Sequence, residues 1–415
     1  MIKLFGDIIL DKWIYGINNK ISPESACLVL LEKEIKFSLG GAANLALSFK
    51  NLNLRSKLFS IIGKDEESKI LINLLKKNKI NYFIKKTKNC TTVKTRMIGN
   101  FNQQIMRLDK ENIKQDFLIN KMIKKIKKND VVVISDYNKG FIQNDTIKKI
   151  LKKTKLVFVD PKQKPDLYKG AYLVKPNMKE YENWNGQFSK KSALKFLKRN
   201  KWNWLLITDG SNGMHILNHK NEYRHFKKGV SEVADTTGAG DAVMATLIYG
   251  YMHKLDMFES VNLACKVASQ NVQKQGVHPV LLEDVKSKII FTNGVFDILH
   301  QGHLALLKYA KSLGQKLIVA INSDQSVKIN KGNNRPVNNV SIRKRQLEIL
   351  PWVDEVIIFN ERTPLNIINE IKPDIIVKGG DYKKKEVIGS KLAQVIIFPF
   401  KKNISTSGII KKLKL

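Results

Sequence analysis

The sequence predicts an α/β protein in which two parallel-sheet domains follow one another and the first carries a small β lid. Three observations favour this fold class. Short apolar runs alternate with helical patterns, a glycine-rich turn at 235–242 opens an apolar helix, and a second strand–turn–helix unit begins at residue 289. At 415 residues the chain can hold two or three cores. We expect domains at 1–282 and 289–415, joined by a short linker at 283–288.

Composition and charge limit the classes of function. With 43% hydrophobic and 27% charged residues the chain reads as globular. It lacks an apolar run long enough to span a bilayer and a signal-peptide pattern. Its three cysteines lie far apart without metal-ligand spacing, which fits a reducing compartment. We therefore expect a cytoplasmic protein without a membrane partner.

The net charge of +36 raises the question of nucleic-acid binding. The lysines are spread along the chain beside many isoleucines and asparagines, all residues with A/T-rich codons, so drift in base composition explains the excess. Residues 121–130 (KMIKKIKKND) illustrate this, because Met122, Ile123 and Ile126 form an inward stripe and the lysines an outward face. We expect a solvated helix there and no nucleic-acid partner.

The first domain reads as strands and helices in alternation. Its opening apolar strand is interrupted by Gly6-Asp7. Further strands are predicted at 56–62, 131–135, 156–160 and 204–208, and helices at 67–77 and 144–152. Residues 82–108 alternate between polar and apolar side chains instead, which is typical of antiparallel strands with one polar face. We assign this segment to a lid.

A glycine pair precedes a small-residue helix start at 37–46, FSLGGAANLA. Gly40 and Gly41 would let a sugar approach the backbone closely, and Asn44 could hydrogen-bond its hydroxyl groups. The alternative is a tight strand-to-helix turn without a ligand.

Two further turns could carry a nucleotide. In KPNMKE (175–180), Asn177 and Glu180 are three residues apart, a spacing suited to ordering hydrated Mg²⁺ and nucleotide phosphates. The same spacing is typical of a helix capping box, which the local sequence alone favours. TDGSNG (208–213) could contact a nucleotide or form a hairpin equally well. A histidine pair, His215 and His219, falls in a predicted hairpin, so its spacing of four does not indicate a metal site.

The segment DTTGAGDA (235–242) carries the strongest signal of the first domain. Gly238, Ala239 and Gly240 would present successive backbone N–H groups at a helix N-terminus, an anion hole for a phosphate in transfer. Asp241 would lie beside it and could take the proton from an attacking sugar hydroxyl. The alternative role for Asp241 is that of a helix cap.

GGAAN, N-x-x-E and DTTGAGD in this order resemble the ribokinase-type (PfkB) sugar kinases over residues 1 to about 282. The resemblance implies a doubly wound sheet with a small β lid, Asp241 as catalytic base, ATP with Mg²⁺ near Asn177 and Glu180, and a homodimer through the kinase domain. The residues expected at ATP are Asn177, Met178, Lys179, Glu180, Thr208, Gly210, Gly213, Gly238, Ala239 and Gly240. Those expected at the sugar are Asp7, Gly40, Gly41 and Asn44.

The second domain opens with IIFTNGVFDILHQGH (289–303). His300 and His303 are predicted in or beside the first helical turn after a strand, where free N–H groups and the helix dipole attract phosphate. This H-x-G-H pattern resembles the cytidylyltransferase-like nucleotidyltransferases, in which the two histidines stabilise nucleotide phosphates, on a Rossmann-like sheet. The residues expected at the nucleotide and its phosphates are Asn293, Gly294, Phe296, Gly302, Lys331, Arg335, Lys378, Gly379, Asp381, Ser405 and Thr406.

Both domains together, with ISPE (21–24), DYNKG (136–140) and VKGGDY (377–382), resemble the family of bifunctional heptose kinases and adenylyltransferases of lipopolysaccharide core synthesis. The resemblance implies phosphorylation of D-glycero-β-D-manno-heptose 7-phosphate at C1, and AMP transfer from ATP to heptose 1-phosphate. The connection between the domains is shorter than in that family, and Ser25-Ala26-Cys27 replaces a proline-rich stretch. The alternative is another PfkB-type sugar kinase fused to a CTP- or ATP-dependent nucleotidyltransferase of different sugar specificity.

Overall fold

The computed structural model describes residues 1–111, 120–227, 235–273, 276–286, 288–314, 316–380 and 384–399. The chain divides into two compact units, Met1–Val285 and Lys286–Leu415. The short helix α9 (Leu282–Val285) occupies the first part of the predicted linker, and its Val285 packs into the core of the first unit.

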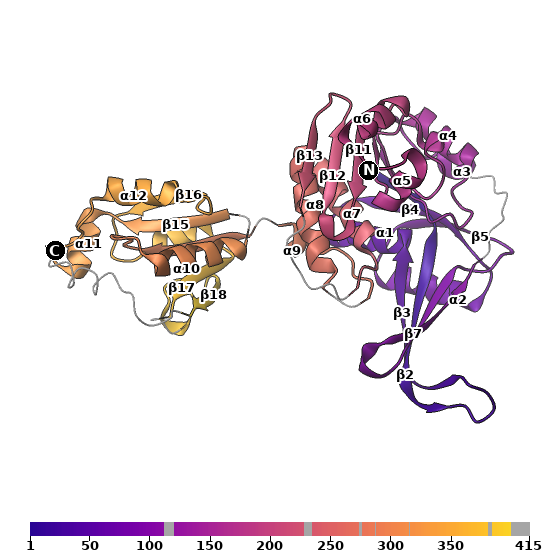
Figure 1. Cartoon of the computed structure of the whole chain (residues 1–415), viewed down its shortest axis with the longest axis horizontal. Helices are drawn as coiled ribbons and strands as arrows, with labels where there is room; N and C mark the ends of the chain where they lie inside the picture. Colours follow the sequence, from indigo (N-terminus) through magenta and orange to yellow (C-terminus); the bar gives the residue numbers. More distant parts are fainter. Residues whose placement is uncertain are drawn as a thin grey trace. The chain divides into compact units, whose positions relative to one another are not determined.

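A nine-stranded sheet forms the centre of the first unit (Figure 1). Its strand order is β13-β12-β11-β10-β9-β8-β1-β4-β5; the strands from β11 to β5 run parallel, and β12 and β13 are added antiparallel at one edge. The strands are β1 (Ile2–Gly6), β4 (Ser56–Ile62), β5 (Tyr82–Lys86), β8 (Val131–Ser135), β9 (Val157–Asp160), β10 (Leu173–Val174), β11 (Trp204–Thr208), β12 (Met214–Asn218) and β13 (Tyr223–Phe226).

Helices cover both faces of this sheet. In β8, Val131 and Val133 face one apolar core while Val132 and Ile134 face the other, so a parallel strand buried on both sides reads as an unbroken apolar run. The first core is closed by α1 (Ala42–Asn51), α2 (Glu66–Lys77), α7 (Ala239–Met252) and α8 (Met257–Asn271). The second is closed by α3 (Asn120–Ile123), α4 (Asn144–Lys153), α5 (Met178–Asn185) and α6 (Lys190–Arg199).

The predicted helix at 121–130 is wrong in its length. Only α3 is helical, and tighter turns carry the chain on to Asp130. Met122, Ile123 and Ile126 are nevertheless buried, as the stripe predicts. Lysines three and four residues apart repel one another on a helix surface, which accounts for its early end.

A separate four-stranded sheet forms the lid, whose strands project away from the nine-stranded sheet in Figure 1. It has the order β3-β2-β6-β7, with β2 (Ile8–Ile21), β3 (Leu28–Gly41), β6 (Val93–Ile98) and β7 (Gln104–Lys110). The prediction of antiparallel strands holds for β6 and β7 but is wrong for β5, which pairs parallel with β4 in the large sheet. The sequence analysis missed β2 and β3, because the buried base of β2 reads as a core strand.

The second unit holds a five-stranded parallel sheet of order β16-β15-β14-β17-β18. Its strands are β14 (Ile289–Gly294), β15 (Lys316–Asn322), β16 (Glu355–Phe359), β17 (Ile375–Gly379) and β18 (Gln394–Phe398). Its helices are α10 (Gln301–Ser312), α11 (Asp324–Lys331), α12 (Val340–Glu348) and α13 (Leu365–Ile371). Among the described residues of either unit, none forms a helix long and apolar enough to cross a membrane.

Candidate active sites

Asp241 lies in the first turn of α7, three residues after the left-handed N-cap residue Gly238, which has φ 81°. Its side chain is buried and both carboxylate oxygens are held. Asn44 Nδ2 donates to Oδ2 at 3.0 Å, and the Tyr137 hydroxyl donates to Oδ1 at 2.8 Å. Asn44 comes from α1 and Tyr137 from the loop after β8, so three distant segments fix this carboxylate beside the helix N-terminus.

The surroundings of Asp241 raise the pKa of its carboxyl group. Burial raises the pKa of Asp241 to about 6, and the nearby Asp160 also raises it, while the bonds from Asn44 and Tyr137 lower it. At neutral pH the group is therefore largely ionised, yet it is a stronger base than an ordinary aspartate. That combination suits a general base near physiological pH.

An ion pair that sequence analysis missed lies against the glycine turn. Lys175 Nζ is 3.0 Å from Asp160 Oδ1, and both side chains flank Gly240, where an added Cβ would lie 3.5 Å from Lys175 Nζ. Asp160 ends β9 and Lys175 follows β10, and these strands are parallel neighbours. Neighbouring parallel strands end at the same edge of a sheet. The position of each residue at the end of a strand could therefore have predicted that the two side chains lie together. The pair places a cation beside the glycine turn at the start of α7.

The predicted nucleotide segments lie side by side. Asn177 forms an isolated parallel bridge with Thr208, next to Gly210 (φ 51°) and Gly213 (φ 97°) in the turn between β11 and β12. For each of the two segments, the structure forms the local-structure alternative that the sequence offered. Asn177 and Glu180 make a capping box at the start of α5, where Met178 and Lys179 occupy the first turn, and the TDGSNG turn closes a hairpin. Local structure thus explains these residues without excluding a nucleotide.

A magnesium ion would find few protein ligands here. Within the described ranges no group of three or more His, Cys, Asp or Glu side chains could hold a metal. Burial raises the pKa of Asp160, and the nearby Glu180 raises it further. One oxygen of Glu180 pairs with Lys162, and the other accepts the Asn177 N–H. The residues therefore fit a metal that arrives with ATP and keeps phosphate and water ligands.

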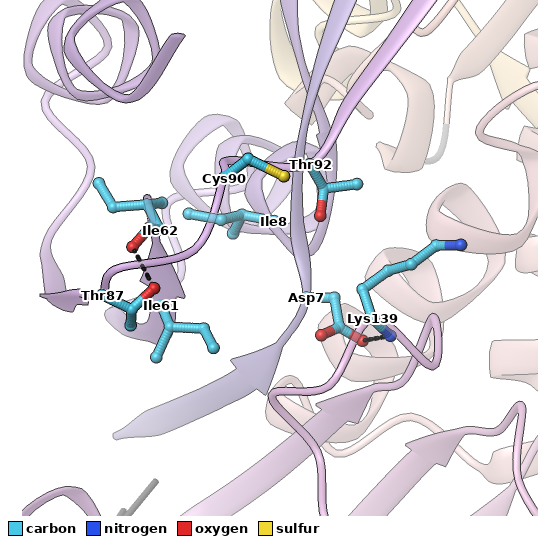
Figure 2. Close-up of a pocket in the computed structure, with 8 residues that line it drawn as sticks. All are labelled: Asp7, Ile8, Ile61, Ile62, Thr87, Cys90, Thr92 and Lys139. Carbon is cyan, nitrogen blue, oxygen red and sulfur yellow. Dashed lines mark hydrogen bonds between the residues drawn. The ribbon is translucent and has the colours of Figure 1, made fainter. Parts of the chain in front are cut away.

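Asp7 anchors the loop that carries Tyr137. Its carboxylate accepts backbone N–H bonds from Tyr137 at 2.9 Å, Lys139 at 3.2 Å and Phe141 at 3.1 Å. Figure 2 shows the Asp7 carboxylate beside the backbone nitrogen of Lys139, in a small pocket that Ile8 and Cys90 also line. Burial raises the pKa of Asp7 to about 6. Asp7 thus fixes the backbone of the loop that carries Tyr137.

The glycine pair ends β3 and starts α1. Gly41 has φ 56°, and a Cβ at Gly40 would lie 2.0 Å from Asp11 Oδ2. The tight strand-to-helix turn that the sequence offered as the alternative is present. The backbone at Gly40 lies close to the side chain of Asp11, which is buried. Asp11 pairs with Arg96 Nη1 at 2.6 Å. Neither residue was predicted, because they lie on lid strands whose pairing the sequence did not reveal.

The two histidines of the second unit form a stacked pair. His300 is the N-cap of α10 and His303 lies in its first turn, as predicted, with ring centroids 3.8 Å apart. Both Nδ1 atoms are buried without a hydrogen-bond partner in the described part of the chain. Burial lowers the pKa of His300, and burial together with the neighbouring ring lowers the pKa of His303 to about 4. Both imidazoles are therefore neutral at neutral pH, and their Nδ1 atoms have no hydrogen-bond partner among the described residues.

Several predicted residues gather around this pair. Phe296 lies against Gly294, with its ring centroid 5.1 Å from that of His303, and Lys331 is close enough to lower the His303 pKa. Lys378 donates to the Asn293 carbonyl at 2.9 Å, and burial lowers its pKa to about 8. Gly302 lies between the histidines in α10, and Gly379 ends β17. Asp381, Ser405 and Thr406 lie outside the described residues.

Two arginines hold the loop before α12 in place. Arg343 is fully buried and donates to the carbonyls of Val295, Asn322 and Asn338 and to Asp324. In the same loop, Arg335 pairs with Asp297 at 3.2 Å. Arg335 is therefore engaged by a neighbouring carboxylate, and Arg343 ties three segments of the site together.

The model of the pfkB family of carbohydrate kinases matches residues 6–283, and the cytidylyltransferase-like model matches residues 291–412. Full-length relatives share the same order. The chain is 37% identical to "Bifunctional protein HldE" of Campylobacter fetus over 99% of this chain and 98% of the relative. It is 35% identical to that of Haemophilus influenzae over 99% and 96%.

The chain belongs to the HldE family of bifunctional proteins. The resemblance stated from its motifs is thereby confirmed, and so is its activity class, a carbohydrate kinase joined to a nucleotidyltransferase.

Solved structures match the first unit in fold. Phosphofructokinase-2 from Escherichia coli gives a TM-score of 0.60 at 17% identity, over 69% of this chain and 96% of that one. Ribokinase from Thermotoga maritima gives 0.56 at 19% identity, over 68% and 97%. These likenesses confirm the ribokinase-like fold predicted for the kinase, and the family match confirms the second domain.

Proposed function

We propose that the first unit transfers the γ-phosphate of ATP to the C1 hydroxyl of D-glycero-β-D-manno-heptose 7-phosphate. The second unit then transfers AMP from ATP to heptose 1-phosphate, giving ADP-heptose and pyrophosphate. The observation that carries this proposal is the full-length HldE relationship together with two separately built sites, one around Asp241 and one around His300 and His303. A phosphatase must remove the 7-phosphate between the two reactions.

In the kinase step, Asp241 would take the proton of the attacking hydroxyl. Asn44 and Tyr137 fix its orientation, so the carboxylate does not have to reorganise during the reaction. The N–H groups at Gly238–Gly240 and the Lys175 ammonium would stabilise the charge on the transferring phosphoryl group. Mg²⁺ bound with ATP would neutralise phosphate charge there, near Asp160 and Glu180.

In the adenylyl transfer, the nucleophile is a sugar phosphate that is already ionised, so no strong base is needed. The site has to orient two anions and stabilise charge on the α-phosphate. The two stacked imidazoles, whose buried Nδ1 atoms lack partners in the described chain, and the N-terminus of α10 support that role. Lys378 supplies a buried cation close by.

We also propose a homodimer formed through the lid. Its strands expose apolar side chains that water does not favour: Ile21, Leu28, Leu31, Met106 and Leu108 are between 49% and 69% exposed. Replacing Leu108 by aspartate should convert a dimer to a monomer in sedimentation analysis.

The test of the proposed reactions is incubation of the protein with heptose 7-phosphate and ATP, with and without an added phosphatase, followed by mass analysis. Without the phosphatase, heptose 1,7-bisphosphate should accumulate; with it, ADP-heptose should form. Turnover of CTP in place of ATP in the second step, or of another sugar phosphate in the first, would contradict the proposal.

A further inference from the structure

The two faces of the lid differ in chemistry. Residues in register across the four strands lie on one face, because side chains alternate along each strand. Ser38, Asp11, Lys94 and Asp109 are in register across β3, β2, β6 and β7 and form one polar row. The opposite face carries the apolar residues, among them Leu108. The polar row runs across the face on which Asp11 meets the glycine pair.

Lys94 is the cation of this row that has no carboxylate partner among the described residues. Asp11 is taken by Arg96 at 2.6 Å and Asp109 by Arg107 at 3.0 Å. Lys94 is half-buried, and no described carboxylate lies within 4.0 Å of its ammonium group. Burial lowers its pKa, against the opposing influence of Asp11 and Asp109. Holding a partly desolvated ammonium without an anion is unfavourable, so an anionic ligand would be favoured there.

The position of Lys94 connects it to the kinase site. Its Nζ lies 5.8 Å from the centroid of the Tyr137 ring, and the hydroxyl of the same ring donates to Asp241. One aromatic ring therefore separates the lid cation from the carboxylate of the site. A sugar with its reacting hydroxyl at Asp241 could place its far end at the lid. Arg96 and Lys139 add positive charge around that point.

We propose that Lys94 binds the phosphate group that the sugar substrate already carries, at the end remote from the hydroxyl that reacts. This inference rests on the proposed function and deepens it, because it gives the kinase site a residue that selects sugar phosphates over free sugars. An ammonium–phosphate contact of this kind is charge-assisted on both sides.

The test compares Lys94→Met with Lys36→Met. Lys36 is a matched control, since it also lies on the lid over a tyrosine ring, 5.1 Å from that of Tyr15, but it is exposed and paired with Glu34 at 3.0 Å. The kinase step is measured with heptose 7-phosphate and with the same heptose lacking its phosphate. For the free sugar, an inhibition constant replaces KM where turnover is too slow.

Lys94→Met should raise KM for heptose 7-phosphate by roughly tenfold to a hundredfold, the value of a hydrogen bond to a charged group. It should change the value for the free heptose far less, and Lys94→Arg should restore part of the loss. Lys36→Met should behave as the unaltered protein.

A role for Lys94 in positioning Tyr137 makes a different prediction. Because Tyr137 holds Asp241, such a role would lower kcat on both sugars alike, and that result would overturn the inference. An unchanged KM in Lys94→Met, with the unaltered protein active on heptose 7-phosphate, would overturn the inference and leave the proposed function standing. An unaltered protein inactive on heptose 7-phosphate would refute both.

Discussion

Replacement of Asp241 by asparagine is the sharpest test of the kinase site. The substitution removes the base but can keep both contacts of the side chain. The amide oxygen can accept from Asn44 Nδ2, now at 3.0 Å from Oδ2, and the amide NH₂ can donate to the Tyr137 hydroxyl oxygen. The site should therefore keep its shape, and any loss of rate reports on proton transfer.

General base catalysis contributes about 10²- to 10⁴-fold to a rate, or roughly 3 to 5.5 kcal/mol in barrier height, so formation of the bisphosphate should fall by at least that range. ADP-heptose formation from added heptose 1-phosphate should remain unchanged, because the second unit has its own core. In the unaltered protein, the kinase rate should fall about tenfold per pH unit below pH 6, where Asp241 becomes protonated.

Both steps are followed by mass analysis of products, with thermal unfolding as the check on folding. Loss of both activities in a folded Asp241→Asn protein would refute the separation into two sites. A variant that keeps more than about a tenth of the kinase rate would refute the role of Asp241 as base, since the lower bound of the expected effect is about a hundredfold.

Three further predictions concern neighbouring residues. His303→Ala should slow adenylyl transfer by roughly 10²- to 10³-fold, the usual effect of removing one stabilising donor, and leave the kinase rate unchanged; a slower kinase would contradict it. Tyr137→Phe removes a bond that lowers the Asp241 pKa, so the acid limb of the kinase pH–rate profile should move to higher pH; a shift to lower pH would refute this assignment. Arg343→Met removes the donors to three backbone carbonyls and to Asp324, and should destabilise the second unit by roughly 3 to 5 kcal/mol in denaturant unfolding, with the transition of the first unit unchanged.

The large sheets were predictable because a strand that is buried on both faces is an unbroken run of apolar residues in the sequence. The strands β4, β8 and β11 have the predicted bounds, since each is a short apolar run ended by polar residues. The lid was only partly predictable. Half of β2 is buried against the large sheet and half projects from it, so its pattern changes along one strand, and the sequence carries no local signal for its partner β6.

The site was predictable where the chemistry is local. Gly238 and Asp241 are three residues apart, and so are His300 and His303, so each motif fixes its own geometry at a helix start. Residues that reach the same point through the fold were missed: Asp11, Arg96, Tyr137, Asp160 and Lys175. Their pairings depend on strand order, which is a property of the whole sheet.

The two sites use burial in opposite senses, and this difference follows from what each must do. In the first, burial raises the pKa of a carboxylate that we propose accepts a proton, so acid would remove its function. In the second, burial lowers the pKa of two imidazoles that we propose bind phosphate, so both are neutral at neutral pH, and a bound polyphosphate would raise their pKa. Mild acid therefore weakens the base of the kinase site, whereas His303, with a pKa of about 4, stays neutral. A fall from pH 7 to about pH 5 should therefore slow the kinase reaction, while the charge on His303 stays the same.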